Sequence, residues 1–210
     1  MVRGRNNKVQ LKDTGATDLT SAIATLDFFH PLSNEIKKYF IDHSYATSFR
    51  KGKLLLKSGQ VCEHLYFIKK GAVRGFIKEG TKDITTWITA ENEIVSSIYG
   101  LDNKHPAFEN IQAIENCELL VISYDDYQDL FIKFPEFNIV ARKVLQKYYQ
   151  DAEGRAFIAR LTKAENKYKF FLTRYGHFVN RIPLKYIASF LGITLETLSR
   201  VRKRLSINNK

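Results

Sequence analysis

Apolar residues follow different spacings along the chain, and each spacing predicts a different kind of element. From Leu19 to Phe40 they recur at helical intervals, which predicts short helices interrupted by Pro31. Between about Ala46 and Ser123 come short runs rich in β-branched, aromatic and leucine residues, separated by glycines. Because many short strands with glycine turns are typical of a β-sandwich or barrel, we predict a compact β domain there. The predicted strands are residues 53–57, 64–70, 72–78, 83–89, 110–114 and 118–123.

The C-terminal part of the chain contains two helical stripes separated by a glycine. Residues 184–191 carry apolar side chains on one helical face, and Gly192 ends that helix. In the next helix Leu198, Val201 and Leu205 form an apolar stripe. A different face of this second helix carries the polar residues Glu196, Ser199, Arg200 and Lys203. A short helix, a turn with glycine and a second helix with a polar outer face form the helix-turn-helix pattern that enters a DNA major groove.

The charge of the chain supports this interpretation because of where it lies. The net charge is +11, but residues 162–210 hold 11 Lys and Arg against 2 Asp and Glu, a balance of +9. Residues 1–17 carry +3 and residues 18–161 carry −1. A concentrated basic region suits a polyanion, because each Lys or Arg that neutralises a phosphate releases condensed counterions. A basic surface that serves solubility alone is the alternative.

After Pro135 the apolar positions return to a helical spacing through about Leu161, which predicts a helix of roughly 25 residues. Such a helix is longer than a single small core usually requires. Its apolar stripe can pack on the β domain or on the same helix of a second subunit. We favour the second, because a helix-turn-helix protein reads two half-sites as a dimer. The predicted dimer helix residues are Val140, Val144, Tyr148 and Ala152.

Other residues narrow the class of protein. Cys62 and Cys117 lack metal or redox spacing and are expected to be reduced core residues of a cytosolic protein. The chain has no apolar run of the ~18 residues that a membrane span needs and no export signal. Asp125 and Asp126 predict a helix start by capping and charge, which we favour over acid or base catalysis. No Ser/His/Asp order, phosphate-binding loop or metal motif is present, so neither an enzyme nor a metal site is expected.

The order of these parts resembles the Crp/Fnr family of bacterial transcription regulators from about residue 20 onward. The stretch LLLKSGQVCEHLYFIKKGAVRGFI is similar to the family's cyclic-nucleotide-binding-type domain, and ITLETLSRVRKRL is similar to its recognition helix. The resemblance implies an α+β fold with an N-terminal double-stranded β-helix (a jelly-roll-like β-roll), a long dimerisation helix and a C-terminal winged helix-turn-helix. The implied parts are the β-roll domain (18–134), the dimerisation helix (135–161) and the DNA-binding domain (162–210). Residues 1–17 are polar, basic and rich in Gly and Asn, which predicts a flexible arm.

The resemblance also places Glu196, Ser199 and Arg200 at positions that touch base edges in the oxygen-responsive branch of the family. Side-chain chemistry agrees, because Arg200 can donate two hydrogen bonds to guanine and Glu196 can accept one from a cytosine amino group. Stabilisation of the helix N-terminus is an alternative role for Glu196. Contacts to backbone phosphates are predicted for Lys185, Thr194, Arg202, Lys203 and Arg204.

The region that would bind an effector departs from the family pattern. In nucleotide-binding members a Gly-Glu-rich cassette ending in Arg-Ser or Arg-Thr holds the ribose and the cyclic phosphate. Here Ser97 lies near the expected Glu, and Phe108 and Glu109 near the expected Arg and its hydroxyl neighbour. Because a carboxylate repels a phosphate, we do not expect cyclic AMP to bind in the usual mode, and no cofactor is assigned. The candidate effector pocket comprises Ser96, Ser97, Tyr99, Phe108, Glu109 and Asn110.

Two hypotheses follow. The first is a cytoplasmic, homodimeric transcription regulator that binds a palindromic site in double-stranded DNA, with RNA polymerase as a compatible further partner and an unknown effector. The alternative is a cyclic-nucleotide-binding signalling module whose C-terminal helices contact protein.

Overall fold

The structure is a computed structural model that describes residues 18–101 and 105–208. The predicted flexible arm, residues 1–17, lies outside these ranges. The described elements are α1 (Thr20–Phe29), α2 (Asn34–His43), β1 (Ser44–Phe49), β2 (Leu54–Leu56), β3 (His64–Lys70), β4 (Val73–Glu79), β5 (Lys82–Thr89), β6 (Ile94–Val95), α3 (Ile98–Leu101), β7 (Asn110–Ala113), β8 (Cys117–Ser123), α4 (Tyr124–Lys133), α5 (Phe137–Arg160), α6 (Ala164–Tyr175), the 3-10 helix η1 (Gly176–Arg181), α7 (Leu184–Leu191) and α8 (Leu195–Asn208).

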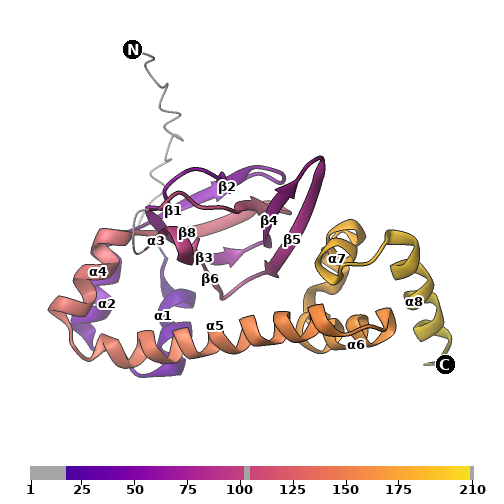
Figure 1. Cartoon of the computed structure of the whole chain (residues 1–210). Coiled ribbons are helices and arrows are strands. Elements are labelled where there is room, and N and C mark those ends of the chain that lie inside the picture. Colours follow the sequence, from indigo (N-terminus) through magenta and orange to yellow (C-terminus); the bar gives the residue numbers. More distant parts are fainter. Residues whose placement is uncertain (1–17, 102–104, 209–210) are drawn as a thin grey trace, which may run out of the picture.

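These elements form a β domain beside one long helix, with a small helical unit at the far end of that helix (Figure 1). Helices α1, α2 and α4 gather near the start of α5, and α6, α7 and α8 lie near its end. The predicted order of β domain, long helix and helix-turn-helix is confirmed.

The strands form two four-stranded sheets with the orders β1-β8-β3-β6 and β2-β7-β4-β5, and all of their pairings are antiparallel. The sheets face each other across a buried apolar cluster that includes Ile68, Val73 and Leu119. All the predicted strands are present, within one residue at each end. Strands β1 and β6 were not predicted, because β1 lacks a run of β-branched residues and β6 spans only Ile94 and Val95. Pairing with β8 and β3 creates them.

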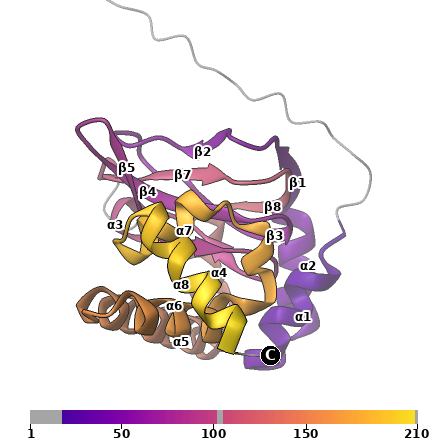
Figure 2. The same cartoon turned by 90° about the vertical axis from the view of Figure 1, so that its right-hand side faces the viewer.

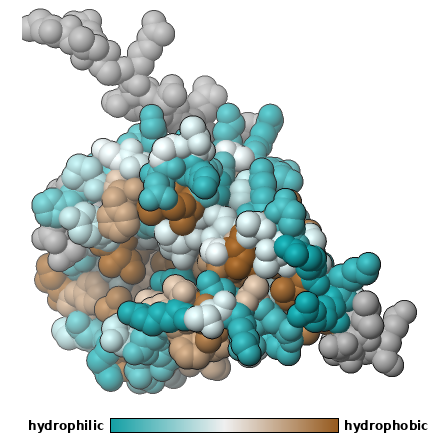
Figure 3. Space-filling view, turned by 45° about the vertical axis from the view of Figure 1, so that its right-hand side comes forward, coloured by the Kyte–Doolittle hydropathy of each residue, from teal (hydrophilic) through white to brown (hydrophobic). Residues whose placement is uncertain are grey.

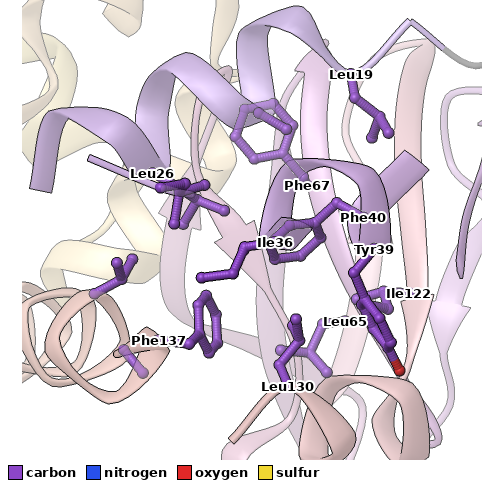
Figure 4. Close-up of a cluster of buried hydrophobic side chains, with 14 of the residues drawn as sticks. Leu19, Leu26, Ile36, Tyr39, Phe40, Leu65, Phe67, Ile122, Leu130 and Phe137 are labelled. Carbon is purple, nitrogen blue, oxygen red and sulfur yellow. The ribbon is translucent and has the colours of Figure 1, made fainter. Parts of the chain in front are cut away.

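A second core lies on the outer face of the first sheet, where helices α1, α2, α4 and α5 cover it. In Figure 4 apolar side chains from these helices converge with side chains from β3 and β8. Phe40 of α2 and Phe137 of α5 meet edge to face, with ring centroids 5.9 Å apart. The break between α1 and α2 follows from Pro31 and is held by the Asp27 carboxylate, which accepts from the Leu32 amide at 2.7 Å.

The first half of α5 belongs to this core, which corrects the predicted dimer face. Val140 is 1% exposed, and Val144 packs against the same cluster. The Tyr148 hydroxyl accepts from the Ile94 amide at 2.7 Å, and burial raises the pKa of Tyr148. Only Ala152 of the predicted set is exposed. The most apolar stripe of α5 therefore packs on its own β domain, which was the alternative left open by the sequence.

Several helix ends differ from their predictions. Ser123, and neither Asp125 nor Asp126, caps α4, because its hydroxyl oxygen accepts from the Asp126 amide at 3.0 Å. Lys163 precedes α6, and no side chain caps the start of that helix. Residues 135–208 contain no strand, so the wing implied by the resemblance is not among the described elements. No helix within residues 18–101 and 105–208 is long and apolar enough to cross a membrane.

The packing of Trp87 on Gly75 gives a test of the β-roll. A Cβ atom on Gly75 would lie 2.2 Å from the indole of Trp87, so Gly75→Ala forces the two strands or the ring to move. We expect the free energy of unfolding to fall by about 1–3 kcal/mol, the usual effect of overpacking. Urea denaturation followed by circular dichroism measures it. Gly176→Ala is the matched control, because no atom lies within 4 Å of its added Cβ. Equal stability of the two variants would contradict the described packing.

Candidate nucleic-acid interface and effector domain

The turn between α7 and α8 has a defined geometry. Gly192 ends α7 in the left-handed conformation, at φ +62°, and the Ile193 amide bonds to the Ala188 carbonyl at 3.1 Å. The Thr194 hydroxyl oxygen then accepts from the Thr197 amide at 3.2 Å and caps the start of α8. The two helices pack against each other through the fully buried side chain of Leu198 and its apolar neighbours. This arrangement confirms the predicted helix-turn-helix.

The polar face of α8 points away from this core. Glu196, Ser199, Arg200 and Lys203 are all exposed, and α8 lies on the outer side of the helical unit (Figure 2). In the view of Figure 3 the surface next to the C-terminal end of the chain is mostly hydrophilic. Hydrogen bonds from its own backbone amide and from Thr194, together with the charge of Arg200, lower the pKa of Glu196. The side chain is therefore a carboxylate at neutral pH, as acceptance of a base amino proton requires.

The residues predicted to contact phosphates differ in how exposed their side chains are. Lys203 and Lys185 are exposed, and Lys185 lies over the ring of Tyr186 with its Nζ 5.1 Å from the centroid. Arg202 is only partly exposed, because it lies beside the buried stripe of α8. Arg204 is exposed and pairs with Glu165 at 3.6 Å.

The residues predicted for an effector pocket differ in their burial and in their hydrogen-bond partners. Ser97 and Asn110 are buried. The side-chain oxygen of Asn110 accepts from the backbone amide of Ser58 at 3.1 Å, which holds the loop after β2. The Ser96 hydroxyl donates to the His64 carbonyl at 3.1 Å. The two aromatic candidates, Tyr99 and Phe108, are 60% and 59% exposed. Their rings lie 5.0 Å apart and form a pair on the surface.

Glu109 has a hydrogen-bond partner that was not predicted from the sequence. The indole Nε1 of Trp87 donates to the Glu109 carboxylate at 2.8 Å. Burial raises the pKa of Glu109, although the hydrogen bond from Trp87 opposes this. Trp87 is the only tryptophan of the chain and lies in a predicted strand, which was the one signal that could have directed attention to it.

The helical unit formed by α6, η1, α7 and α8 shares an apolar cluster with Ile88 and Ala90 of the β domain. Beside this cluster lie polar contacts that the sequence did not reveal. Arg74 of β4 is 2% exposed, and its guanidinium carbon lies 3.9 Å from the ring centroid of Tyr186 in α7. Arg181, in η1, pairs with the carboxylates of Glu91 and Glu115. These residues lie far apart in the sequence, so no local pattern identifies them.

Comparison with known proteins agrees with this division of the chain. Residues 46–134 match the Cyclic nucleotide-binding domain family. The fumarate and nitrate reduction regulatory protein of Yersinia pestis is 25% identical over 177 residues, covering 76% of this chain and 68% of that protein. The cAMP-activated global transcriptional regulator CRP of Salmonella typhimurium is 22% identical over 193 residues, 85% of this chain and 90% of that protein. The structure of FixK2 from Bradyrhizobium japonicum has a TM-score of 0.69 over 79% of this chain and 86% of that one, at 18% identity.

The fold and the matched domain place the chain among proteins that join a cyclic-nucleotide-binding-type β-roll to a C-terminal helix-turn-helix. The chain is similar to transcription regulators of the Crp/Fnr type over most of its length, which agrees with the resemblance seen in its sequence. The relatives are regulators and not enzymes. They do not favour a signalling module whose C-terminal helices contact protein.

The pairing of Arg181 with Glu91 predicts a particular pH dependence of stability. Hydrogen bonding to Arg181 lowers the pKa of Glu91 from 4.5 to about 2. Because the folded value lies below the unfolded one, the stabilisation is complete above pH 4.5 and is lost as the pH falls toward 2. Glu91→Gln should therefore lower the free energy of unfolding at pH 7 but have little effect near pH 2, as measured by denaturant titration.

Glu118→Gln is the control for this experiment, since that exposed carboxylate lies 4.0 Å from Lys70 and forms a weaker pair. A gap between wild type and Glu91→Gln that stays constant from pH 7 to pH 2 would show that the ion pair does not stabilise the fold.

Proposed function

We propose that this protein is a sequence-specific DNA-binding transcription regulator of the Crp/Fnr type that acts as a homodimer on a palindromic site. The observation that carries the proposal is the exposed face of α8, with Glu196, Ser199 and Arg200 free of contacts to the β domain. This face belongs to the segment 162–210, whose net charge is +9. Base edges would be read by the side chains of α8, and the surrounding charge would supply salt-dependent affinity.

The roles of the predicted contact residues can be assigned by their surroundings. Arg200 would pair with a guanine, and Glu196 with a cytosine amino group. Lys203 and Lys185 suit phosphate contacts, because both ammonium groups are exposed. Thr194 and Arg202 suit phosphate contacts less well, since the first caps α8 and the second lies at the edge of the core.

The effector of the β domain would not be cyclic AMP bound in the usual mode. The relative from Salmonella typhimurium is described as cAMP-activated. In this chain the Glu109 carboxyl, which accepts from the Trp87 indole, is expected near the position of the phosphate-binding hydroxyl residue. A carboxyl group there favours ligands without a phosphate, so we assign no cofactor. DNA and RNA polymerase as partners imply action in the cytoplasm.

The outer face of α5 supports the homodimer. Leu145 and Tyr149 are 58% and 67% exposed, and Ala152 and Ala156 continue the same stripe at intervals of three and four residues. Apolar side chains at this spacing are typical of helices that pair side by side. This stripe replaces Val140, Val144 and Tyr148 as the surface for a second subunit, while Ala152 belongs to both sets.

Arg200→Ala tests base reading. An operator is first selected from random duplexes with the wild-type protein, and dissociation constants are then compared for the operator and for each of its single-base variants. We expect discrimination at one base pair to fall by about 1–3 kcal/mol, the contribution of a bidentate pair to guanine. Arg204→Ala is the matched control, because it removes the same charge from α8 while Arg204 pairs with Glu165. It should weaken binding to all sequences alike.

Two outcomes would contradict the proposal of sequence-specific binding. One is a selection that enriches no motif, with and without a cell extract as a source of effector. The other is an Arg200→Ala variant whose base preferences equal those of wild type.

Leu145→Asp tests the dimer face. The wild-type chain has a mass of 24.3 kDa and should sediment with twice that mass. A charge in the apolar stripe should shift the variant to the monomer mass at micromolar concentration, because burying an unpaired carboxylate is unfavourable. Gln146→Asp adds the same charge at the next exposed position and should leave the dimer largely intact. A monomeric wild type, or equal masses for both variants, would argue against this face.

A further inference from the structure

The contact between the β domain and the DNA-binding unit is built around a buried charge. Arg74 is 2% exposed, and its guanidinium donates to Gln112 at 3.0 Å, to Thr85 at 3.1 Å and to Asp83 at 2.8 Å. All these partners belong to the β domain. Because a buried charge is unfavourable unless it is paired and hydrogen-bonded, this network holds the guanidinium in one orientation.

The guanidinium lies between two aromatic rings. Its central carbon is 4.1 Å from the ring centroid of Phe76, on the same strand, and 3.9 Å from that of Tyr186, on α7. A cation over an aromatic face is attracted most strongly where water is excluded. Arg74 therefore presents a preformed cationic surface to the DNA-binding unit, and Tyr186 is the side chain that covers it.

Ser189 adds a second contact from the same helix. It lies three residues after Tyr186 and so on the same face of α7. Its hydroxyl oxygen accepts from the Thr85 amide at 2.9 Å, and its hydroxyl proton is donated to the Asp83 carbonyl at 3.0 Å. Asp83 also pairs with Arg74, so one face of α7 is bound by a single hairpin, β4–β5.

A third contact lies outside this helix. Arg181, just before α7, donates from its NH1 nitrogen to Glu91 at 2.9 Å and also pairs with Glu115. Glu91 follows β5, and Glu115 lies between β7 and β8. Polar contacts therefore attach the DNA-binding unit at two separate places, in addition to the apolar cluster that it shares with Ile88 and Ala90. Together they restrict its rotation about α7 as well as its translation.

The attached position leaves the DNA-reading face free. Glu196, Ser199 and Arg200 take no part in the contacts with the β domain, and all three are exposed. Figure 2 shows α8 on the outer side of α7, with the sheets behind them. The attachment therefore orients the recognition helix without covering it.

We propose that the β4–β5 hairpin positions the recognition helix for DNA, with Arg74, Tyr186 and Ser189 as positioning residues. The inference rests on the proposed function. A dimer reads two half-sites about 34–36 Å apart, so the two recognition helices must be held at a matching separation and angle. Attachment of each unit to its own β domain lowers the conformational freedom that is lost on binding an operator. Non-specific binding, which needs only charge, does not depend on this attachment.

Tyr186→Leu is the principal test, with Tyr186→Phe as the matched control. Leucine removes the aromatic face over Arg74 without changing net charge, whereas phenylalanine keeps the ring. We expect the leucine variant to bind the selected operator about fivefold to thirtyfold more weakly than wild type, within the usual range of coupling between sites. Its affinity for a random duplex should be unchanged. The phenylalanine variant should stay within about twofold of wild type on both duplexes.

Hydrogen exchange measures the attachment of the DNA-binding unit without DNA. Because the Thr85 amide donates to Ser189 across the contact, its hydrogen exchange reports directly on whether the unit is attached. Exchange at Thr85 should be about tenfold faster in Tyr186→Leu and in Ser189→Ala, while amides in the middle of β3 and β8 keep their wild-type protection. That protection also shows that the β domain of each variant is folded. Ser189→Ala should weaken operator binding in the same direction as Tyr186→Leu.

The outcomes separate the two proposals. A wild-type selection with no enriched site contradicts the proposed function and the positioning role together. An enriched site that Tyr186→Leu and Ser189→Ala bind as tightly as wild type, despite faster exchange at Thr85, contradicts the positioning role alone. Tighter operator binding by these variants would also overturn it, because the attachment would then hold the recognition helix away from DNA.

Discussion

The long helix α5 must pack against two different hydrophobic cores, and the arrangement of the whole molecule depends on this. Near its start, Val140 and Ala141 are buried in the core between the first sheet and helices α1, α2 and α4. Near its end, Ile158 is 2% exposed in a core that the DNA-binding unit shares with Ile88 and Ala90 of the β domain. A continuous helix is stiff over this length, so the two cores are held at a fixed separation along its axis. The face that neither core uses carries the exposed side chains of Leu145 and Tyr149.

The polar contacts across the hairpin β4–β5 complement this helix. Apolar packing on α5 fixes the distance between the β domain and the DNA-binding unit, whereas Arg74, Tyr186 and Ser189 restrict their relative rotation. Hydrogen bonds and cation–π contacts depend on direction, and apolar burial does not. The same hairpin carries Trp87, which bonds to Glu109 in the β-roll. One strand pair therefore contacts both the region expected to sense an effector and the helical unit that carries the recognition helix.

Much of the fold could be predicted because its signals are local. Gly192 and the stripes around it defined the helix-turn-helix, and the structure places Glu196, Ser199 and Arg200 on the exposed face as expected. Predicted strands were found where β-branched and aromatic runs occur. Strand β1 was missed because its partners in β8 lie 68 to 78 positions further along the chain. The effector pocket stays a prediction, although the partners of Ser96 and Asn110 were fixed only by folding.

The sequence by itself determined the order of the parts, the concentration of charge in residues 162–210 and the polar face of the recognition helix. These properties depend on spacing and composition, which a chain carries before it folds. Only the tertiary structure decided which face of α5 is covered, because Val140 and Leu145 are both apolar and differ only in what lies opposite them. It also decided the partners of Arg74 and Glu109, since a buried polar group is paired by residues that folding brings to it from other strands and helices.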